Sequence, residues 1–294
     1  MKRSTLRLLL KILLVVLLIT AGVSVGGIVY TLNQYNSSIK EYANLEQYVS
    51  VEEVPAAVEE VDKQAEVQDA TETEDSDTEV PEEIEEPVKP KMINVNFDMD
   101  FEALKAKNSD LIGWIYYEPL ELSYPVVKDR GNDYYEHYSF EQEKNVAGAI
   151  FLDYLCKPNL DSFNSIVYGH NMRNGTMFGS LNSVLLDTTI IENNPYFYIF
   201  TEEDAYMYKI VSAYYTPASS QTYKLDLDYT LDTKKDYVKY MESVSEYKDT
   251  EFFDTEIDDE TRICTLSTCH GLHSTTRTVI HGVLVAKEPR NEEK

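Results

Sequence analysis

Three residues that together could perform nucleophilic catalysis lie in distant segments of the sequence. Cys269 ends the run Thr-Leu-Ser-Thr-Cys, where an apolar segment gives way to a polar one, so its thiol can meet a substrate. His170 follows Gly169 at the end of another strand-like run, and Arg277 opens the last one. An imidazole can exchange protons with a thiol, while a nearby cation lowers the pKa of the thiol and binds an oxyanion. Taken singly, each residue also has a structural interpretation: a buried cysteine, a packed histidine or a surface arginine in a salt bridge.

The remaining cysteines and histidines do not suggest a disulfide framework or a metal site. Cys264 and Cys269 lie on one extended run, about 17 Å apart, whereas a disulfide needs Cα atoms within about 7 Å. Cys156 lies in a loop. His270 and His273 follow Cys269 and could either tune its thiol or be bystanders. Metal sites need three or four ligands at suitable spacing, so we expect neither a metal nor a cofactor.

The segments that must position these residues read as many short strands with a few helices. β-prone runs bounded by turn residues predict strands, and apolar residues at helical spacing predict helices. This mixture is typical of a β-barrel or sandwich with inserted helices. The expected strands cover residues 113–117, 122–128, 149–153, 165–168, 196–200, 206–216, 262–268 and 278–286, and the expected helices cover residues 101–107, 133–138, 176–186 and 232–247.

The N-terminus carries an apolar segment that could cross a membrane. Residues 12–30 are uncharged and span about 28 Å as a helix, close to the thickness of the hydrocarbon core. Because lysines and arginines precede this segment and acidic residues follow it, the N-terminus is expected in the cytoplasm. The alternative is a cleaved signal peptide, since small residues follow the leucine-rich stretch. Either reading places the rest of the chain outside the cell.

Charge is distributed very unevenly. The formal net charge is −26, and residues 46–91 hold 17 acidic residues against three lysines. Such a segment cannot bury enough apolar surface to fold and should be extended by repulsion. We expect it to be a spacer between membrane and catalytic domain, the alternative being a filler of no required length. No basic stripe is visible, which argues against a nucleic-acid partner.

Considered together, these segments resemble the sortases, specifically class B. Tyr-Gly-His-Asn-Met at 168–172, Thr-Leu-Ser-Thr-Cys at 265–269 and Arg277 before a closing strand match the three catalytic motifs of that family in order. Further matches extend the resemblance over residues 97–287: Asn-Ser-Asp-Leu-Ile-Gly-Trp-Ile at 108–115, Tyr-Pro-Val-Val at 124–127, Asn-Asp-Tyr-Tyr at 132–135, Gly-Ala-Ile-Phe-Leu-Asp-Tyr at 148–154 and Asn-Gly-Thr-Met-Phe-Gly-Ser-Leu at 174–181.

The resemblance implies a mainly β fold, an eight-stranded sortase barrel with an N-terminal helical extension and inserted helices. The expected order is a basic cytoplasmic N-terminus (1–11), a transmembrane helix (12–32), a largely disordered acidic extracellular linker (33–91) and the catalytic domain (92–294). The implied activity is cleavage of an LPxTG-like C-terminal sorting signal after its Thr. The thioacyl enzyme then reacts with an amine of a peptidoglycan precursor. The implied partners are therefore secreted proteins that bear this signal, the cell-wall precursor and the cell membrane.

The resemblance also implies residue roles. Cys269 is the expected nucleophile, His170 the acid and base, and Arg277 the oxyanion partner. Ser267 is expected to bind substrate, as are Ser219 and Tyr223 through a gapped match. One departure stands out, because relatives often carry an acidic residue after the cysteine, whereas His270 follows here.

Two other functions are alternatives, and the first of them would use the same residues. A cysteine peptidase would release its acyl group to water, and an inactive extracellular module would only bind peptides.

Overall fold

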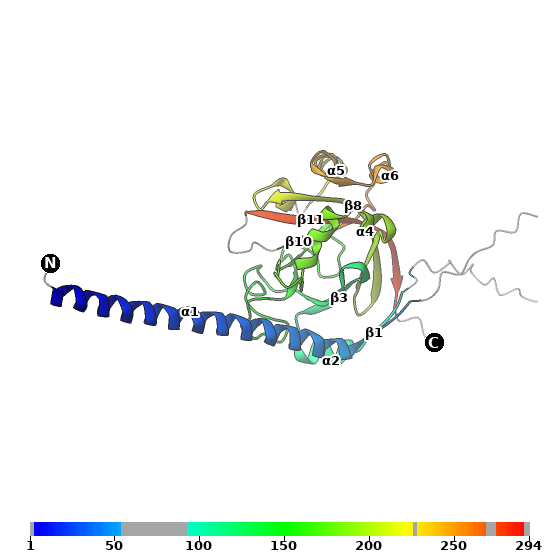
Figure 1. Ribbon diagram of the computed structural model, residues 1–294. Coiled ribbons are helices and arrows are strands. Elements are labelled where there is room, and N and C mark those ends of the chain that lie inside the picture. Colours follow the sequence, from blue (N-terminus) through cyan, green and yellow to red (C-terminus); the bar gives the residue numbers. More distant parts are fainter. Residues whose placement is uncertain (1–2, 54–92, 94, 226–227, 269–274, 291–294) are drawn as a thin grey trace, which may run out of the picture.

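The computed structural model describes residues 3–53, 93, 95–225, 228–268 and 275–290. Its centre is a closed barrel of eight strands (Figure 1), in the order β11-β10-β6-β5-β4-β3-β7-β8, with β8 pairing back onto β11. A short strand, β9, extends the sheet beyond β8. The strands are β3 (Leu111–Tyr117), β4 (Leu122–Val127), β5 (Ile150–Leu152), β6 (Asn164–Gly169), β7 (Tyr196–Phe200), β8 (Asp204–Pro217), β9 (Tyr247–Lys248), β10 (Ile263–Thr268) and β11 (Thr276–Pro289).

Two long strands close the barrel. β8 and β11 have 14 residues each and pair antiparallel from Thr276↔Pro217 to Pro289↔Asp204. Their register shifts between His281 and Gly282, and again between Leu284 and Ala286, and such irregularities let a strand bend around a barrel. Inside, aromatic and aliphatic side chains from the barrel strands form one large buried cluster.

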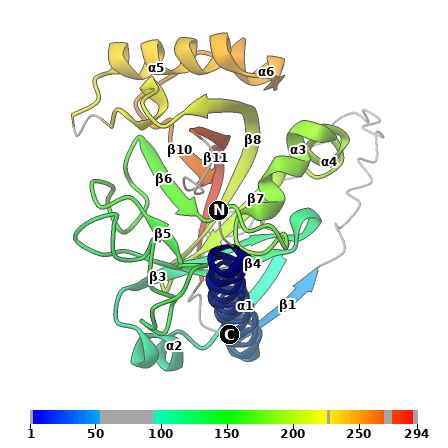
Figure 2. The ribbon, with the colours of Figure 1, turned by 60° about the vertical axis from the view of Figure 1, so that its left-hand side comes forward.

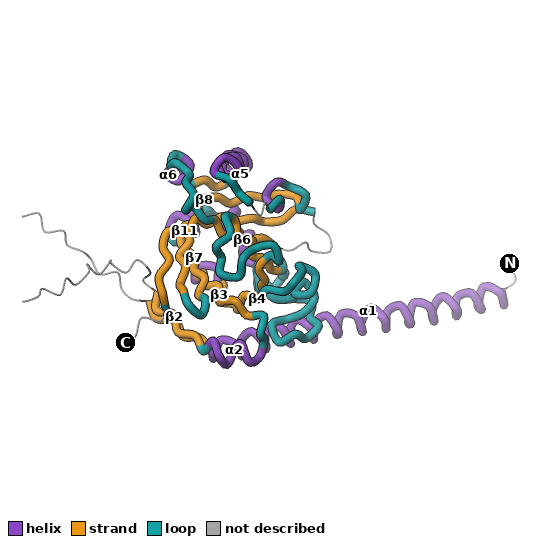
Figure 3. The backbone as a smooth tube through the Cα atoms, turned by 180° about the vertical axis from the view of Figure 1, so that it is seen from behind, coloured by secondary structure: helices purple, strands orange, loops and turns teal. Residues whose placement is uncertain are grey.

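Several helices lie around the barrel. Figures 2 and 3 show α5 (Leu231–Val244) and α6 (Thr250–Phe253) on one side and α2 (Phe101–Lys107) on the opposite side. The other helical segments are η2 (Glu118–Leu120), η3 (Gly179–Asn182), α3 (Ser183–Leu186), α4 (Thr189–Asn193) and η4 (Gln221–Tyr223). The helix predicted at 101–107 is confirmed as α2. The helix predicted at 232–247 is confirmed as α5, which ends earlier than expected because Tyr247 lies on β9. Both begin after a capping side chain, Asp100 and Thr230 respectively.

Two other helix predictions need correction. Residues 133–138 form turns, because the chain doubles back there: Asn145 N donates to His137 O, and Tyr138 bridges Lys144. The helix predicted at 176–186 begins only at Gly179, as η3 followed by α3. Met177 has a φ of 55°, a left-handed conformation that a right-handed helix cannot include.

The N-terminal helix α1 (Arg3–Leu45) extends well beyond the expected membrane span of residues 12–32. It contains an 18-residue window with a mean hydropathy of 2.7, none of which is buried, so it is long and apolar enough to cross a membrane. Its last turns pack on the barrel, where Ser38, Glu41, Tyr42 and Leu45 are buried. The Tyr42 hydroxyl donates to Gly148 O at 2.8 Å, and its ring meets Tyr124 edge to face.

The chain continues from α1 into ordered structure rather than into a linker. After η1 (Glu46–Tyr48), β1 (Val49–Glu53) pairs antiparallel with β2 (Val95–Met99), and Glu53 is the partner of Val95. Residues 54–91 of the expected linker lie outside the described residues. Because the strands on either side of the acidic segment are partners, its two ends lie side by side. The linker expected at residues 33–91 therefore does not begin at residue 33, because residues up to Glu53 lie in helices and a strand, and the connection from α1 to the barrel does not depend on the length of residues 54–91. For residues 54–91 the linker stays a prediction.

Candidate active site

A parallel pair of strands brings two of the three candidate catalytic segments together. β6 and β10 run side by side, with Gly169 as the partner of Thr268. His170 directly follows Gly169, and Cys269 directly follows Thr268. Cys269 lies outside the described residues, as do His270 and His273. Its contact with His170 therefore stays a prediction, supported by the neighbouring ends of the two strands.

His170 is held by one well-defined hydrogen bond. Its Nε2 lies 2.7 Å from Glu136 O. A carbonyl oxygen only accepts, so Nε2 carries a proton and Nδ1 is the nitrogen that can take up and release one. The half-buried ring also rests against Gly148, and the His170 carbonyl accepts bonds from Met172 N and Phe178 N. The imidazole is thus fixed in one tautomer and one position.

Arg277, the second residue of β11, lies beside the end of β10. Its Nη1 donates to Thr268 O at 3.4 Å. The guanidinium lies over the Tyr223 ring at 5.3 Å and over the Tyr168 ring at 6.0 Å, distances typical of cation–π contacts. Among the described residues, its buried Nε finds no hydrogen-bond partner. The structure therefore places Arg277 next to the residue that precedes Cys269.

The three expected substrate-binding residues occupy different surroundings. Ser267 is fully buried, and its Oγ lies 2.7 Å from the Tyr223 hydroxyl. Tyr223 is half-buried on η4 and stacks on Tyr168. Ser219 is exposed in the loop between β8 and η4. Ser267 and Tyr223 thus belong to the surroundings of Arg277, whereas no described contact ties Ser219 to them.

Sequence reasoning missed two members of this arrangement, Tyr168 and Thr268. Tyr168 immediately precedes the Gly-His pair. An aromatic side chain next to a segment expected to meet Arg277 is the feature of the sequence that could have indicated its role. Thr268 precedes Cys269 and binds the strand that carries Arg277: Thr278 N donates to its Oγ1 at 2.9 Å. Nothing in the sequence indicates that second contact, which depends on the register of β10 and β11.

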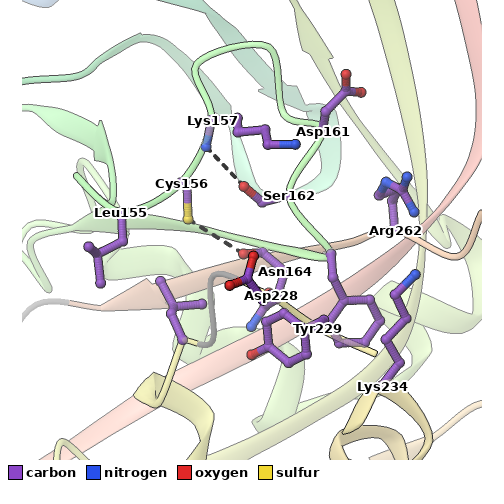
Figure 4. A pocket seen from close by; sticks show the side chains of 12 residues that line it. Leu155, Cys156, Lys157, Asp161, Ser162, Asn164, Asp228, Tyr229, Lys234 and Arg262 are labelled. Atoms are coloured by element: carbon purple, nitrogen blue, oxygen red, sulfur yellow. Dashed lines mark hydrogen bonds between the residues drawn. The ribbon is translucent and has the colours of Figure 1, made fainter. Parts of the chain in front are cut away.

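A cavity formed by described residues lies away from this arrangement (Figure 4). It has a volume of about 310 Å³ and adjoins Asn164, the first residue of β6, whereas His170 follows the last residue of that strand. Cys156 lines this cavity, and its Sγ donates to Asn164 O at 3.4 Å. Burial raises the pKa of the Cys156 thiol to about 12 and also raises the pKa of the Cys264 thiol. Neither described cysteine is therefore a competent nucleophile at neutral pH.

No group of three or more His, Cys, Asp or Glu side chains within the described part of the chain could hold a metal ion.

Comparison with known proteins identifies the family. The sortase domain family matches residues 115–285. Sortase B of Listeria monocytogenes is 32% identical over 198 residues, which cover 66% of this chain and 78% of that protein. The chain belongs to the class B sortases. Sortases are cysteine transpeptidases, and this membership gives the chain that general activity.

Solved structures agree with this sortase in fold. A Staphylococcus aureus sortase B-substrate complex has a TM-score of 0.57 and 27% identity, covering 63% of this chain and 84% of that one. Sortase B from B. anthracis has a TM-score of 0.61 and 26% identity, covering 86% of this chain and 99% of that one. The predicted eight-stranded sortase barrel with an N-terminal helix and inserted helices is confirmed.

Proposed function

We propose that this sortase cleaves an LPxTG-related C-terminal sorting signal after its Thr and transfers the new carboxyl end to an amine of a peptidoglycan precursor. The observation that carries this proposal is the pairing of Gly169 with Thr268, with Arg277 bonded to Thr268. This pairing favours a site where the thiol, imidazole and guanidinium converge. The substrate seen with the S. aureus relative supports a peptide ligand of this kind.

The first half-reaction forms a thioester. The Cys269 thiolate attacks the threonine carbonyl carbon, and the C–N bond breaks when the tetrahedral intermediate collapses. His170, as imidazolium, gives its Nδ1 proton to the departing amine. Its Nε2 keeps its own proton and donates it in the hydrogen bond to Glu136 O throughout, which keeps the ring in place.

Arg277 stabilises the negative oxygen of the tetrahedral intermediate. A buried N–H without a partner costs about 1–3 kcal/mol. The Nε of Arg277 is such a group among the described residues, and a substrate oxygen would relieve this cost. The tyrosine rings of 168 and 223 hold the guanidinium without neutralising it.

In the second half-reaction an amine replaces the thiol. His170, now neutral, takes a proton from the incoming amine, which attacks the thioester carbonyl and releases the Cys269 thiolate. Tyr223 and Ser219 would line the peptide groove, and the buried Ser267 would contribute to substrate binding through its hydrogen bond with Tyr223.

The location follows from α1. We propose that it anchors the protein in the cell membrane, with the N-terminus in the cytoplasm and the barrel outside. The basic residues before the apolar stretch and the acidic residues after it support this orientation.

A panel of fluorogenic pentapeptides related to LPxTG tests the function, with and without an amine acceptor. We expect cleavage after Thr, a peptide–amine product, and a thioester adduct on Cys269 by mass spectrometry that Cys269→Ala lacks. Only hydrolysis products at high amine concentration would establish a peptidase instead. An unmodified Cys269 with every peptide would leave a binding module.

A further inference from the structure

The segment that follows His170 packs tightly against η3. Phe178 N donates to His170 O at 3.0 Å, just before η3 begins at Gly179. A Cβ atom on Gly179 would overlap Met172 O, so only glycine permits this approach. The tight packing fixes the position of the last residue of η3, the half-buried Asn182.

Both polar atoms of the Asn182 amide form hydrogen bonds, each with a different segment of the chain. Its Oδ1 accepts a hydrogen bond from the Thr278 hydroxyl on β11. Its Nδ2 donates to Asn171 Oδ1 at 3.3 Å. An asparagine amide can accept and donate at the same time, which a carboxylate or a hydrocarbon side chain at this position cannot.

The partners of Asn182 are the immediate neighbours of the catalytic candidates. Asn171 follows His170, and Thr278 follows Arg277. Thr278 N in turn donates to the Oγ1 of Thr268, the residue before Cys269. One side chain therefore connects the segments that carry all three residues.

We infer that Asn182 is a positioning residue for the transpeptidase reaction, locking the His170 turn to the ends of β10 and β11. The inference rests on the proposed function. The reaction needs the imidazole, the thiol and the guanidinium in register, although they come from three strands. Errors of about 1 Å in such an alignment cost about 100-fold in rate. Asn182 provides a side-chain tie between the His170 turn and β11.

The test compares full-length parent protein with Asn182→Ala and Thr278→Val, which remove opposite halves of one hydrogen bond. We expect each to lower kcat for a sorting-signal peptide by about 10- to 100-fold, with KM changed less than threefold. The double variant should lose no more than about twofold beyond the worse single variant, because both changes break the same link. Asn193→Ala, an exposed asparagine on α4, is the matched control.

A second readout needs no substrate. The rate of Cys269 alkylation by iodoacetamide is measured from pH 5 to 9, with the modified cysteine identified by mass spectrometry. A displaced His170 or Arg277 should shift this pH profile, whereas a change in stability alone would lower the melting temperature and leave the profile in place. Profiles and kcat values within twofold of the parent's would overturn the inference.

The role of Asn182 and the proposed function can fail independently of each other in these experiments. If the parent cleaves no peptide, the function fails, and the alkylation profiles still decide the role of Asn182. If Asn182→Ala does not fold, Thr278→Val carries the same prediction, because valine fits a buried strand position and leaves no unpaired hydroxyl.

Discussion

Gly148 lies directly against the imidazole of His170. It has a φ of +57°, and a Cβ atom built on it would lie 3.0 Å from His170 Cδ2 and 2.5 Å from Tyr135 O. The same atom would lie 3.1 Å from Glu136 O, the acceptor of the His170 hydrogen bond. The absence of a side chain at this position therefore allows the histidine to rest on its acceptor segment.

Gly148→Ala should damage both stability and catalysis. An alanine here would have to adopt a left-handed backbone conformation, and its methyl group would overlap two carbonyl oxygens. We expect these two effects together to lower the free energy of unfolding by about 1–3 kcal/mol. Because the added methyl also pushes on the His170 ring, kcat/KM should fall further than the loss of folded protein explains. Denaturant unfolding and peptide cleavage measure the two effects. Gly131→Ala is the control, since no atom lies within 4 Å of its Cβ position. Equal behaviour of the two variants would contradict the prediction.

Tyr223 should contribute mainly through its ring. Tyr223→Phe removes the hydroxyl that lies 2.7 Å from Ser267 Oγ but keeps the ring below Arg277. We expect kcat/KM to change by less than about fivefold, since one hydrogen bond contributes about 1 kcal/mol. Tyr223→Ala removes the support of the guanidinium and should lower kcat/KM at least about tenfold. If Phe is as poor as Ala, the hydroxyl rather than the ring positions the site.

The sequence was informative where local pattern and burial agree. The sequence before His170 and before Cys269 is in each case a β-prone run that gives way to turn or loop residues, so β6 and β10 could be predicted. The burial of the end of α1 could not be predicted, because Ser38 and Glu41 look like linker residues. Glu41 is nevertheless buried and accepts a hydrogen bond from Glu141 N, 100 residues further along the chain. The ties through Asn182 and Thr268 likewise depend on the register between distant strands.

Acid should destabilise the barrel through His281. Burial lowers the pKa of this histidine to about 3. Its Nδ1 bonds Thr265 and its Nε2 bonds Tyr214. The unfolded chain therefore binds more protons than the folded one between about pH 3 and the ordinary histidine pKa of about 6.5. The free energy of unfolding should fall with pH in that window, by up to about 1.4 kcal/mol per pH unit, and not above it.

Comparison with His281→Gln isolates this contribution, because carboxylates that also titrate in acid are common to both proteins. The variant should be less stable at pH 7 and lose less on acidification. Parallel stability curves from pH 7 to pH 4 would exclude His281 as the source.

The juxtamembrane residues should stabilise the barrel. A chain that begins at residue 33 keeps Tyr42 and Leu45, which are 8% and 1% exposed, whereas one that begins at residue 92 loses both and the partner strand of β2. Burial of each large apolar side chain contributes about 1.5–3 kcal/mol. We expect the shorter chain to be less stable by at least about 3 kcal/mol in urea unfolding. Equal midpoints and slopes would show that these contacts add nothing.

The pairing of Glu53 with Val95 also has a practical consequence. Material inserted between these two strands enters and leaves the fold at one place, so it adds no length to the connection between α1 and the barrel. Surface sites of this kind usually tolerate insertions. A fluorescent protein or affinity tag placed there would report on the enzyme in living cells without altering how α1 is joined to the barrel.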